Sequence, residues 1–298
     1  MKHLERALNN QNQWWKILLV FLGVVGSLLL VSVLADILET FFGWSFPDII
    51  IIGVSSFVFF LVTSVFIRDL HKRNFKEVIN GRQSVRWKRM FFGMAAWGGI
   101  MALTIVADYY NNPDNFIVNF DLKTLIPLIF LAILIFPVQA GFEEFLFRGY
   151  LAQIFGAWTK NRWAAVIFPT ILFGLMHSAN PEVVRYGFWP MMTQYMCIGF
   201  IFGIVSILDD GIELAMGAHI INNIFGLAFL SFEDSVIETS DALLYAKTME
   251  IPSVLSTVIG MTFIGAIFIG ILKSKYKWKF SILNLKIEKS KIEESELV

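Results

Sequence analysis

Long apolar runs separated by short polar segments dominate this sequence. Crossing the hydrocarbon core of a bilayer takes about 20 predominantly apolar residues in a helix, and eight runs reach or approach that length. They cover approximately residues 16–38, 49–66, 90–107, 122–147, 163–177, 189–208, 212–230 and 252–272. The run at 163–177 is short, and the run at 122–147 ends in charged residues. The pattern predicts an all-α fold, a polytopic integral membrane bundle of about eight transmembrane helices.

Composition agrees with membrane residence. Of the 298 residues, 56% are hydrophobic and only 16% are charged, whereas soluble chains carry about 25% charged residues. The 24 basic and 24 acidic residues balance, so there is no global basic field to attract nucleic acid. The single cysteine, Cys197, cannot form an internal disulfide, and no Cys/His cluster indicates a structural metal.

Basic residues predict the orientation. All but four of the 24 lysines and arginines precede the first run, lie between the second and third or the fourth and fifth, or follow the eighth. Short loops rich in Lys and Arg stay cytoplasmic, so we expect both termini on the cytoplasmic side. The first run is longer than the apolar region of a typical signal peptide, and we expect it to be an uncleaved anchor.

No repeat, linker or low-complexity tract divides the chain, so we expect one membrane domain. Within it, residues 1–121 hold three spans and a basic cytoplasmic loop. Residues 122–230 hold the core with the unusual polar groups, and residues 231–298 hold the last span and a polar cytoplasmic tail.

Polar residues inside the apolar runs gather in three places. A charge at the centre of a membrane helix costs about 2.5 to 3.5 kcal/mol on insertion scales, so each needs a partner or a purpose. The three motifs are Gly-Phe-Glu-Glu-Phe-Leu-Phe-Arg-Gly at 141–149, Phe-Gly-Leu-Met-His at 173–177 and Gly-Ala-His-Ile-Ile-Asn-Asn at 217–223.

Helical geometry gives the two adjacent glutamates different roles. Glu144 and Arg148 are four residues apart, about 40° around a helix, and can form an ion pair. Glu143 lies about 140° from Arg148, which leaves its carboxylate without a strong cation partner and suited to act as a general base. We therefore assign Glu144 and Arg148 to architecture and Glu143 to chemistry. The alternative is that all three form one buried charge network.

His219 and Asn223 are also four residues apart, on one stripe of a helix, where both could donate hydrogen bonds to an oxyanion. The alternative is that His219 only bonds a neighbouring helix. If the chain turns near Trp158, Glu143 and His177 lie at depths that differ by about 6 Å, which favours their convergence.

Together the three motifs resemble the signatures of the CAAX-protease and bacteriocin-processing intramembrane proteases, also called the Abi or type II CAAX prenyl endopeptidase family. The signatures are Glu-Glu-x-x-x-Arg, Phe-x-x-x-His and His-x-x-x-Asn/Asp, and the resemblance covers roughly residues 125–230. The motif residues are Glu143, Glu144, Arg148, Phe173, His177, His219 and Asn223.

The resemblance implies hydrolysis of a peptide bond within the membrane. Glu143, assisted by His177, would activate water. His219 and Asn223 would stabilise the tetrahedral oxyanion. The supporting residues would be Glu144 and Arg148, which hold the helix geometry, and Phe173, which packs beside the site.

Zinc is the cofactor to weigh, because Glu143, His177 and His219 could supply three ligands. The sequence has no His-Glu-x-x-His motif, and Asn223 is placed as a donor, so we favour a glutamate-dependent mechanism without a cofactor. Zinc dependence is the alternative.

The expected setting is a bacterial cytoplasmic membrane, with the bilayer and a peptide or lipidated protein substrate as partners and no nucleic acid. CAAX-type processing, bacteriocin or signal-peptide maturation and self-immunity are the roles that the resemblance implies. A proton-coupled transporter also needs buried Glu, Arg and His, but no pair of broken helices supports that alternative. A third reading is a non-catalytic immunity or scaffold protein of the same fold.

Overall fold

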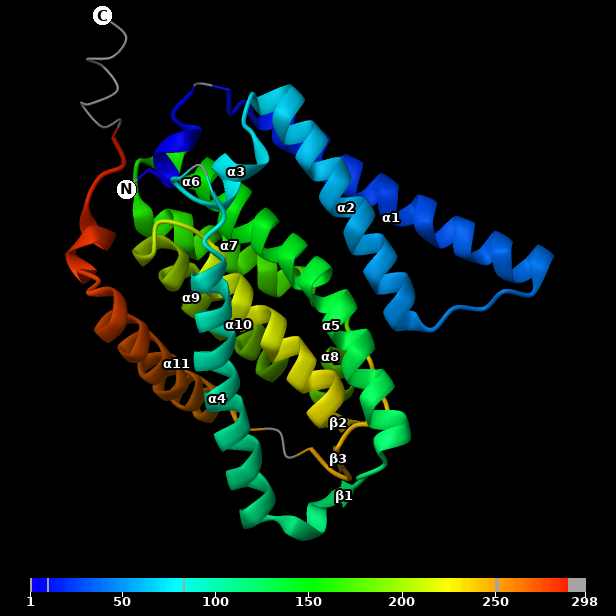
Figure 1. The fold of residues 1–298 in the computed structure, drawn as a ribbon. Helices are drawn as coiled ribbons and strands as arrows, with labels where there is room; N and C mark the ends of the chain where they lie inside the picture. The colour runs from blue at the N-terminus through cyan, green and yellow to red at the C-terminus, as the bar shows by residue number, and fades with distance from the viewer. Residues whose placement is uncertain (1, 10, 83, 250–251, 289–298) are drawn as a thin grey trace, which may run out of the picture.

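Apolar helices form a bundle with a three-stranded sheet at one end (Figure 1). The computed structural model describes residues 2–9, 11–82, 84–249 and 252–288. The helices are η1 (Leu4–Ala7), α1 (Trp14–Phe42), α2 (Asp48–His71), α3 (Phe75–Ile79), α4 (Trp87–Asn111), η2 (Pro113–Asn115), α5 (Leu122–Glu144), η3 (Phe145–Leu151), α6 (Ala152–Thr159), α7 (Arg162–Met176), α8 (Pro181–Tyr186), α9 (Phe188–Leu208), α10 (Glu213–Ile224), η4 (Phe225–Phe229), α11 (Val254–Tyr276) and η5 (Phe280–Asn284). The strands are β1 (Phe116–Val118), β2 (Leu230–Phe232) and β3 (Leu244–Ala246).

Six of the described helices are long and apolar enough to cross a membrane, and they make this an integral membrane protein of the polytopic helical class. They are α1, α2, α4, the continuous helix Leu122–Thr159, α9 and α11. The other two predicted runs are also helical but shorter. α7 has 15 residues, and α10 has 12 before it continues into η4.

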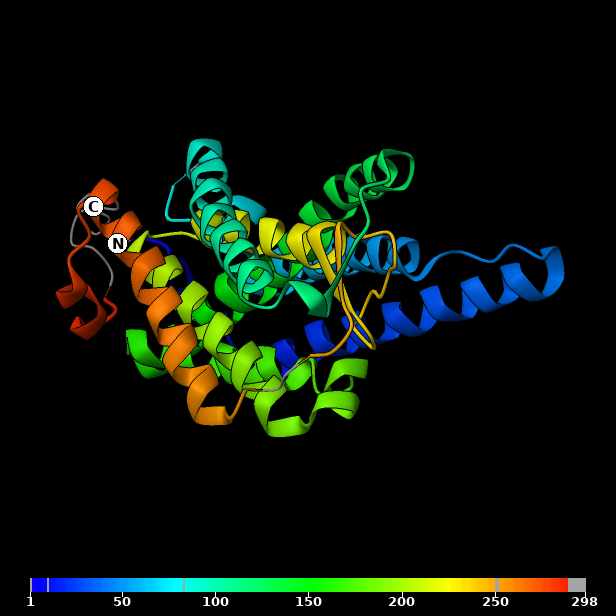
Figure 2. The same ribbon diagram turned by 90° about the horizontal axis from the view of Figure 1, so that it is seen from below.

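The α1–α2 hairpin extends to one side of the bundle in both views (Figures 1 and 2). Its free surface is apolar, with Leu29 61% and Phe41 76% exposed. Only α2 packs firmly on the rest, where the ring of Phe59 lies 5.4 Å from that of Phe142 in α5. Such a surface is stable in lipid, where burial against protein is not needed to keep apolar side chains from water.

α4 and α10 pack closely at the centre because glycines face the partner backbone. A Cβ at Gly217 would overlap the carbonyl oxygen of Met90, and one at Gly93 would overlap that of Leu214. Small residues let membrane helices approach to backbone contact. α10 is thereby held against α4, with α5 and α9 on its other sides.

The segments predicted to be cytoplasmic lie together at one end of the bundle. The backbone N–H of Ile287 donates to the carbonyl of Lys160 at 3.1 Å, and the N–H of His3 donates to Oδ1 of Asp210 at 2.8 Å. The described N-terminal residues and the chain after α11 therefore share this end with the α6–α7 and α9–α10 turns. Residues 289–298 of the expected polar tail lie outside the described residues.

The opposite end carries the small sheet, which the apolar pattern did not predict. β3 is central, antiparallel to β1 and parallel to β2. Each strand has three residues, and its partners are distant in sequence, so no local alternation marks it. The sheet connects the outer ends of α4, α5 and α10.

Candidate active site

Glu143 and Glu144 are the last two residues of α5, where the helix changes its hydrogen-bonding pattern. The next seven residues form the π-helical segment η3, and all seven are buried. α10 likewise passes into the π-helical segment η4 directly after Ile224, one residue beyond Asn223. π turns inside α-helices are rare and often occur at functional sites.

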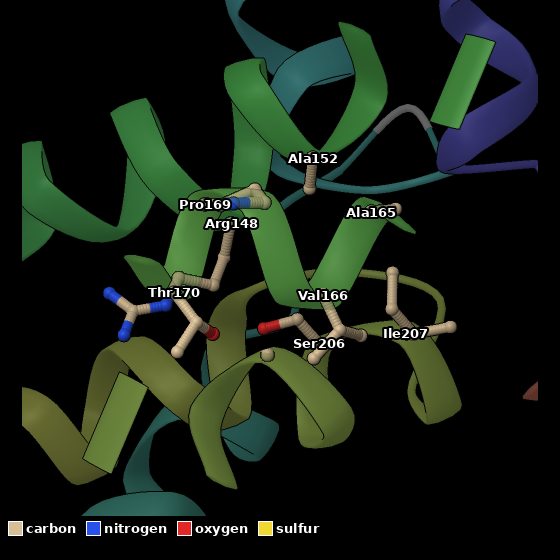
Figure 3. A pocket seen from close by; sticks show the side chains of 9 residues that line it. Arg148, Ala152, Ala165, Val166, Pro169, Thr170, Ser206 and Ile207 are labelled. Atoms are coloured by element: carbon tan, nitrogen blue, oxygen red, sulfur yellow. The ribbon is translucent and has the colours of Figure 1, made fainter. Parts of the chain in front are cut away.

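The predicted ion pair is present. Nη1 of Arg148 donates to Oε1 of Glu144 at 2.8 Å, and both side chains are almost fully buried. The guanidinium carbon of Arg148 lies 4.2 Å from the centre of the Phe173 ring, a cation–π contact. Figure 3 shows the side chain of Arg148 between helices, in a narrow gap that Thr170 and Ser206 also line.

His219 lies between the two glutamates. Its Nδ1 is 2.8 Å from Oε1 of Glu144, and its Nε2 is 3.7 Å from Oε2 of Glu143. An ionised carboxylate only accepts hydrogen bonds, so the Nδ1–H of His219 donates to Glu144. The imidazole of His219 thus links Glu143 to the Glu144–Arg148 pair. This arrangement agrees in part with the alternative that the two glutamates and Arg148 form one buried charge network.

Glu143 has one oxygen occupied and one free. Nε2 of Gln139, one helical turn earlier in α5, donates to Oε1 of Glu143. Oε2 is buried without a hydrogen-bond partner among the described residues, and it is the oxygen that faces His219. The unpaired oxygen is the one available to accept a proton.

Asn223 lies in the same polar group. Its Nδ2 donates to Oε1 of Gln139 at 2.8 Å, and its Oδ1 accepts from Nδ2 of Asn222 at 3.2 Å. Gln139 therefore joins the predicted base to the predicted oxyanion donor. In the sequence, Gln139 could have been identified from its position in an apolar run, four residues before Glu143.

His177 caps the C-terminal end of α7. Its Nδ1 lies 2.7 Å from the carbonyl oxygen of Phe173, and its ring stacks on Tyr195 with centroids 4.2 Å apart. The hydroxyl of Tyr195 in turn donates to the buried Glu182 and accepts from Asn180. The plane of the His177 ring is held by these contacts.

The three motifs converge around Phe173. Its ring centre lies 4.6 Å from that of His177 and 5.9 Å from that of His219. Within the described residues no hydrogen bond joins His177 to Glu143, so assistance by His177 stays a prediction.

The proposed zinc ligands do not form a complete set. Oε2 of Glu143 and Nε2 of His219 are near each other, but the described residues hold no group of three His, Cys, Asp or Glu side chains arranged for a metal ion. Catalytic zinc takes three protein ligands and a water. The residues therefore do not fit zinc in this arrangement.

Comparison with known proteins identifies the segment that contains these residues. Residues 124–225 match the family model described as type II CAAX prenyl endopeptidase, Rce1-like. All three motifs lie in this segment, so their family resemblance is confirmed there. The matched family, by its description, consists of prenyl endopeptidases, which are hydrolases of peptide bonds.

A bacterial protein is also similar to this chain. The uncharacterized protein YyaK of Bacillus subtilis (strain 168) is 33% identical over 171 residues. The aligned segment spans 57% of this chain and 57% of that relative. No solved structure matches the chain.

Two further histidines are buried near the site's supporting helix, although sequence reasoning assigned them no role. Nε2 of His71 lies 2.8 Å from the hydroxyl of Tyr150. Nε2 of His3 lies 3.2 Å from the carbonyl oxygen of Arg148. Burial lowers the pKa of His3 from 6.5 despite the nearby carboxylate of Asp210. These residues tie polar segments to η3, and no apolar pattern marks them.

Proposed function

We propose that this protein is an intramembrane endopeptidase that hydrolyses a peptide bond in a membrane-associated or lipidated peptide or protein. CAAX-type processing, maturation of a bacteriocin or signal peptide, and self-immunity all fall within this chemistry. The setting that we propose is a bacterial cytoplasmic membrane.

In the proposed reaction, Oε2 of Glu143 takes a proton from water as the water oxygen bonds to the carbonyl carbon of the substrate. The carbonyl oxygen becomes an oxyanion, which accepts hydrogen bonds from His219 and Asn223. When the C–N bond breaks, the proton held by Glu143 passes to the leaving nitrogen, which gives one carboxylic acid and one amine. His177 assists in placing the water.

The pairing of Glu143 with His219 is the observation that carries this proposal. A carboxylate oxygen without a hydrogen-bond partner faces an imidazole at 3.7 Å in the protein interior. The imidazole is fixed by its other nitrogen on Glu144. A buried unpaired acceptor costs stability, and such groups occur where they have a catalytic role. Acceptance of a proton from water is such a role.

The test uses purified protein in lipid vesicles with two peptide sets, one carrying a prenylated C-terminal cysteine and one unlipidated. Products are identified by mass spectrometry. We expect cleavage by the wild type and a loss of at least about 100-fold in Glu143→Ala, the range for removal of a general base. Glu39→Ala, which removes an exposed carboxylate far along α1, is the control. Equal cleavage by Glu143→Ala and the wild type would contradict the mechanism.

The physiological substrate can be sought separately. We expect membrane peptides to accumulate in a strain that carries Glu143→Ala in place of the wild-type protein. Comparative proteomics of the membrane fraction identifies them, and the Glu39→Ala strain serves again as the reference. A substrate of the enzyme should appear uncut in the first strain and cut in the second.

A further inference from the structure

A row of hydrogen bonds leads from Trp97 in α4 to the Glu143 carboxylate. Nε1 of Trp97 donates to Oδ1 of Asn222 at 3.1 Å, and Nδ2 of Asn222 donates to Oδ1 of Asn223 at 3.2 Å. Nδ2 of Asn223 donates to Oε1 of Gln139 at 2.8 Å, and Nε2 of Gln139 donates to Glu143. Four consecutive bonds thus connect three helices.

The chemistry of the two ends fixes the direction of every bond in this row. An indole N–H can only donate, and an ionised carboxylate can only accept. Between these ends stand three primary amides, each of which could be turned end for end. With Trp97 donating and Glu143 accepting, all three amides must point the same way. Reversal of one amide would set donor against donor or acceptor against acceptor.

Packing holds the donor end in place. The side chain of Trp97 is 1% exposed. Its rings lie edge-on to Phe202 and Phe268, with centroids 5.3 Å and 5.0 Å away. The close approach of α4 to α10 at Gly93 and Gly217 keeps its helix against the one that bears Asn222. The indole is therefore a fixed starting point for the row.

We propose that Trp97, Asn222 and Gln139 are positioning residues, which fix the amide of Asn223 with one N–H toward the reacting carbonyl and hold Oε1 of Glu143. This inference rests on the proposed peptidase function. Nδ2 of Asn223 donates one N–H to Gln139, and its other N–H is left to donate to the oxyanion. If Trp97 no longer donates, Oδ1 of Asn222 loses its donor. The Asn222 amide is then held from one side only, and the amide of Asn223, which accepts from it, is less firmly fixed toward the oxyanion.

The kinetic test is Trp97→Phe, which removes the N–H and keeps an aromatic ring. We expect kcat to fall about tenfold with KM changed by less than about twofold, because the lost interaction acts in the transition state. In an Asn223→Ala background the same substitution should have no further effect, since Trp97 acts through Asn223. Trp163→Phe is the matched control, because the indole of Trp163 also donates to an amide, that of Asn284 at 3.0 Å, away from the site.

Additive effects in the double variant, or an equal loss in Trp163→Phe, would overturn the positioning role. Because Trp97→Phe also changes the packing on Phe202 and Phe268, Asn222→Leu provides a second break in the row with the indole intact. It should give the same fall in kcat and the same absence of effect without Asn223. Thermal unfolding of each variant checks that the fold is retained.

A readout independent of turnover separates this inference from the proposed function. In protein labelled with ¹⁵N at the tryptophan indoles, the Trp97 resonance is assigned by its loss in Trp97→Phe. We expect Asn222→Leu to shift this resonance and speed its hydrogen exchange about tenfold or more, with the Trp163 resonance unmoved. An unchanged Trp97 resonance would overturn the row of bonds. Failure of the wild type to cleave any peptide, with the shift present, would instead overturn the peptidase proposal.

Discussion

Nδ1 of His219 lies 2.8 Å from Oε1 of Glu144. Glu144 therefore does more than pair with Arg148, because its one oxygen accepts from both the guanidinium and the imidazole. The contact places the proton of a neutral His219 on Nδ1 and turns Nε2 toward Glu143. Donation from Nε2 to an oxyanion then requires a second proton on the ring.

The two glutamates should respond oppositely to truncation. Glu144→Ala leaves Arg148 buried without its carboxylate, and breaking a buried pair costs about 3 to 5 kcal/mol. Glu143→Ala removes a carboxylate whose Oε2 has no hydrogen-bond partner, so stability should stay the same or rise. Thermal unfolding in detergent measures both. If Glu143→Ala proved the more destabilising change, Glu143 would be the structural residue and Glu144 the one available for chemistry.

Chelation should leave peptide cleavage intact. Only Glu143 and His219 bring free donor atoms together, and the described residues supply no third ligand. Activity is to be measured before and after exhaustive treatment with a zinc chelator, together with the metal content by elemental analysis. Activity that disappears on chelation and returns with added zinc would overturn the metal-free mechanism.

The close packing of α4 on α10 predicts different effects for two glycines of one helix. A Cβ at Gly93 would overlap the Leu214 carbonyl, whereas a Cβ at Gly99 would meet nothing within 4 Å. Gly93→Ala should cost about 1 to 3 kcal/mol of stability through overpacking, and Gly99→Ala should be neutral. Both the thermal midpoint and the cleavage rate should fall in the first variant alone. Equal midpoints would show that α4 and α10 can separate freely.

The buried His3 predicts a dependence on pH. Its Nε2–H donates to the Arg148 carbonyl and its Nδ1 accepts from Gln153, so the ring is neutral in the folded protein. Because burial lowers the folded-state pKa below 6.5, the unfolded chain binds more protons than the folded one as the pH falls below about 6.5. Stability is therefore lost on acidification and retained at higher pH.

Thermal midpoints of the wild type and of His3→Gln at pH 7.5 and pH 5 isolate this contribution from other titrating groups. The wild type should lose more stability between the two pH values than the variant, in which residue 3 does not titrate. Equal losses would mean that His3 is not buried as a neutral ring.

The apolar pattern predicted the helical bundle because lipid imposes length and composition on each span. It placed Leu122 correctly at the start of the fourth helix, and the turn near Trp158 falls where Lys160 adopts a left-handed conformation. It did not predict the continuation of that helix through Phe147 to Thr159. Residues 149–157 of that helix are buried or half-buried by neighbouring protein, and no periodic signal separates protein burial from lipid exposure.

Local spacing predicted the Glu144–Arg148 pair because both residues lie on one helix. The contacts of His219 with two glutamates depend on the approach of α10 to α5, which spacing along one helix does not specify. Gln139 and Trp97 went unnoticed because an amide in an apolar run and a tryptophan in a span are common residues. Their significance comes from partners on other helices.

The π-helical segment Phe145–Leu151 has a consequence for any shortened version of this chain. A π turn carries one residue more per hydrogen-bonded ring than an α turn, so deletion of one residue here would restore regular α-helical hydrogen bonding. It would also remove the wide turn that now separates the residues on either side of the segment. A deletion between Glu144 and Arg148 would make the helix locally regular and change the spacing of the ion pair from four residues to three. In this segment, regular α-helical hydrogen bonding and the present spacing of Glu144 and Arg148 require different numbers of residues. The number of residues in the segment therefore determines which of the two the chain adopts.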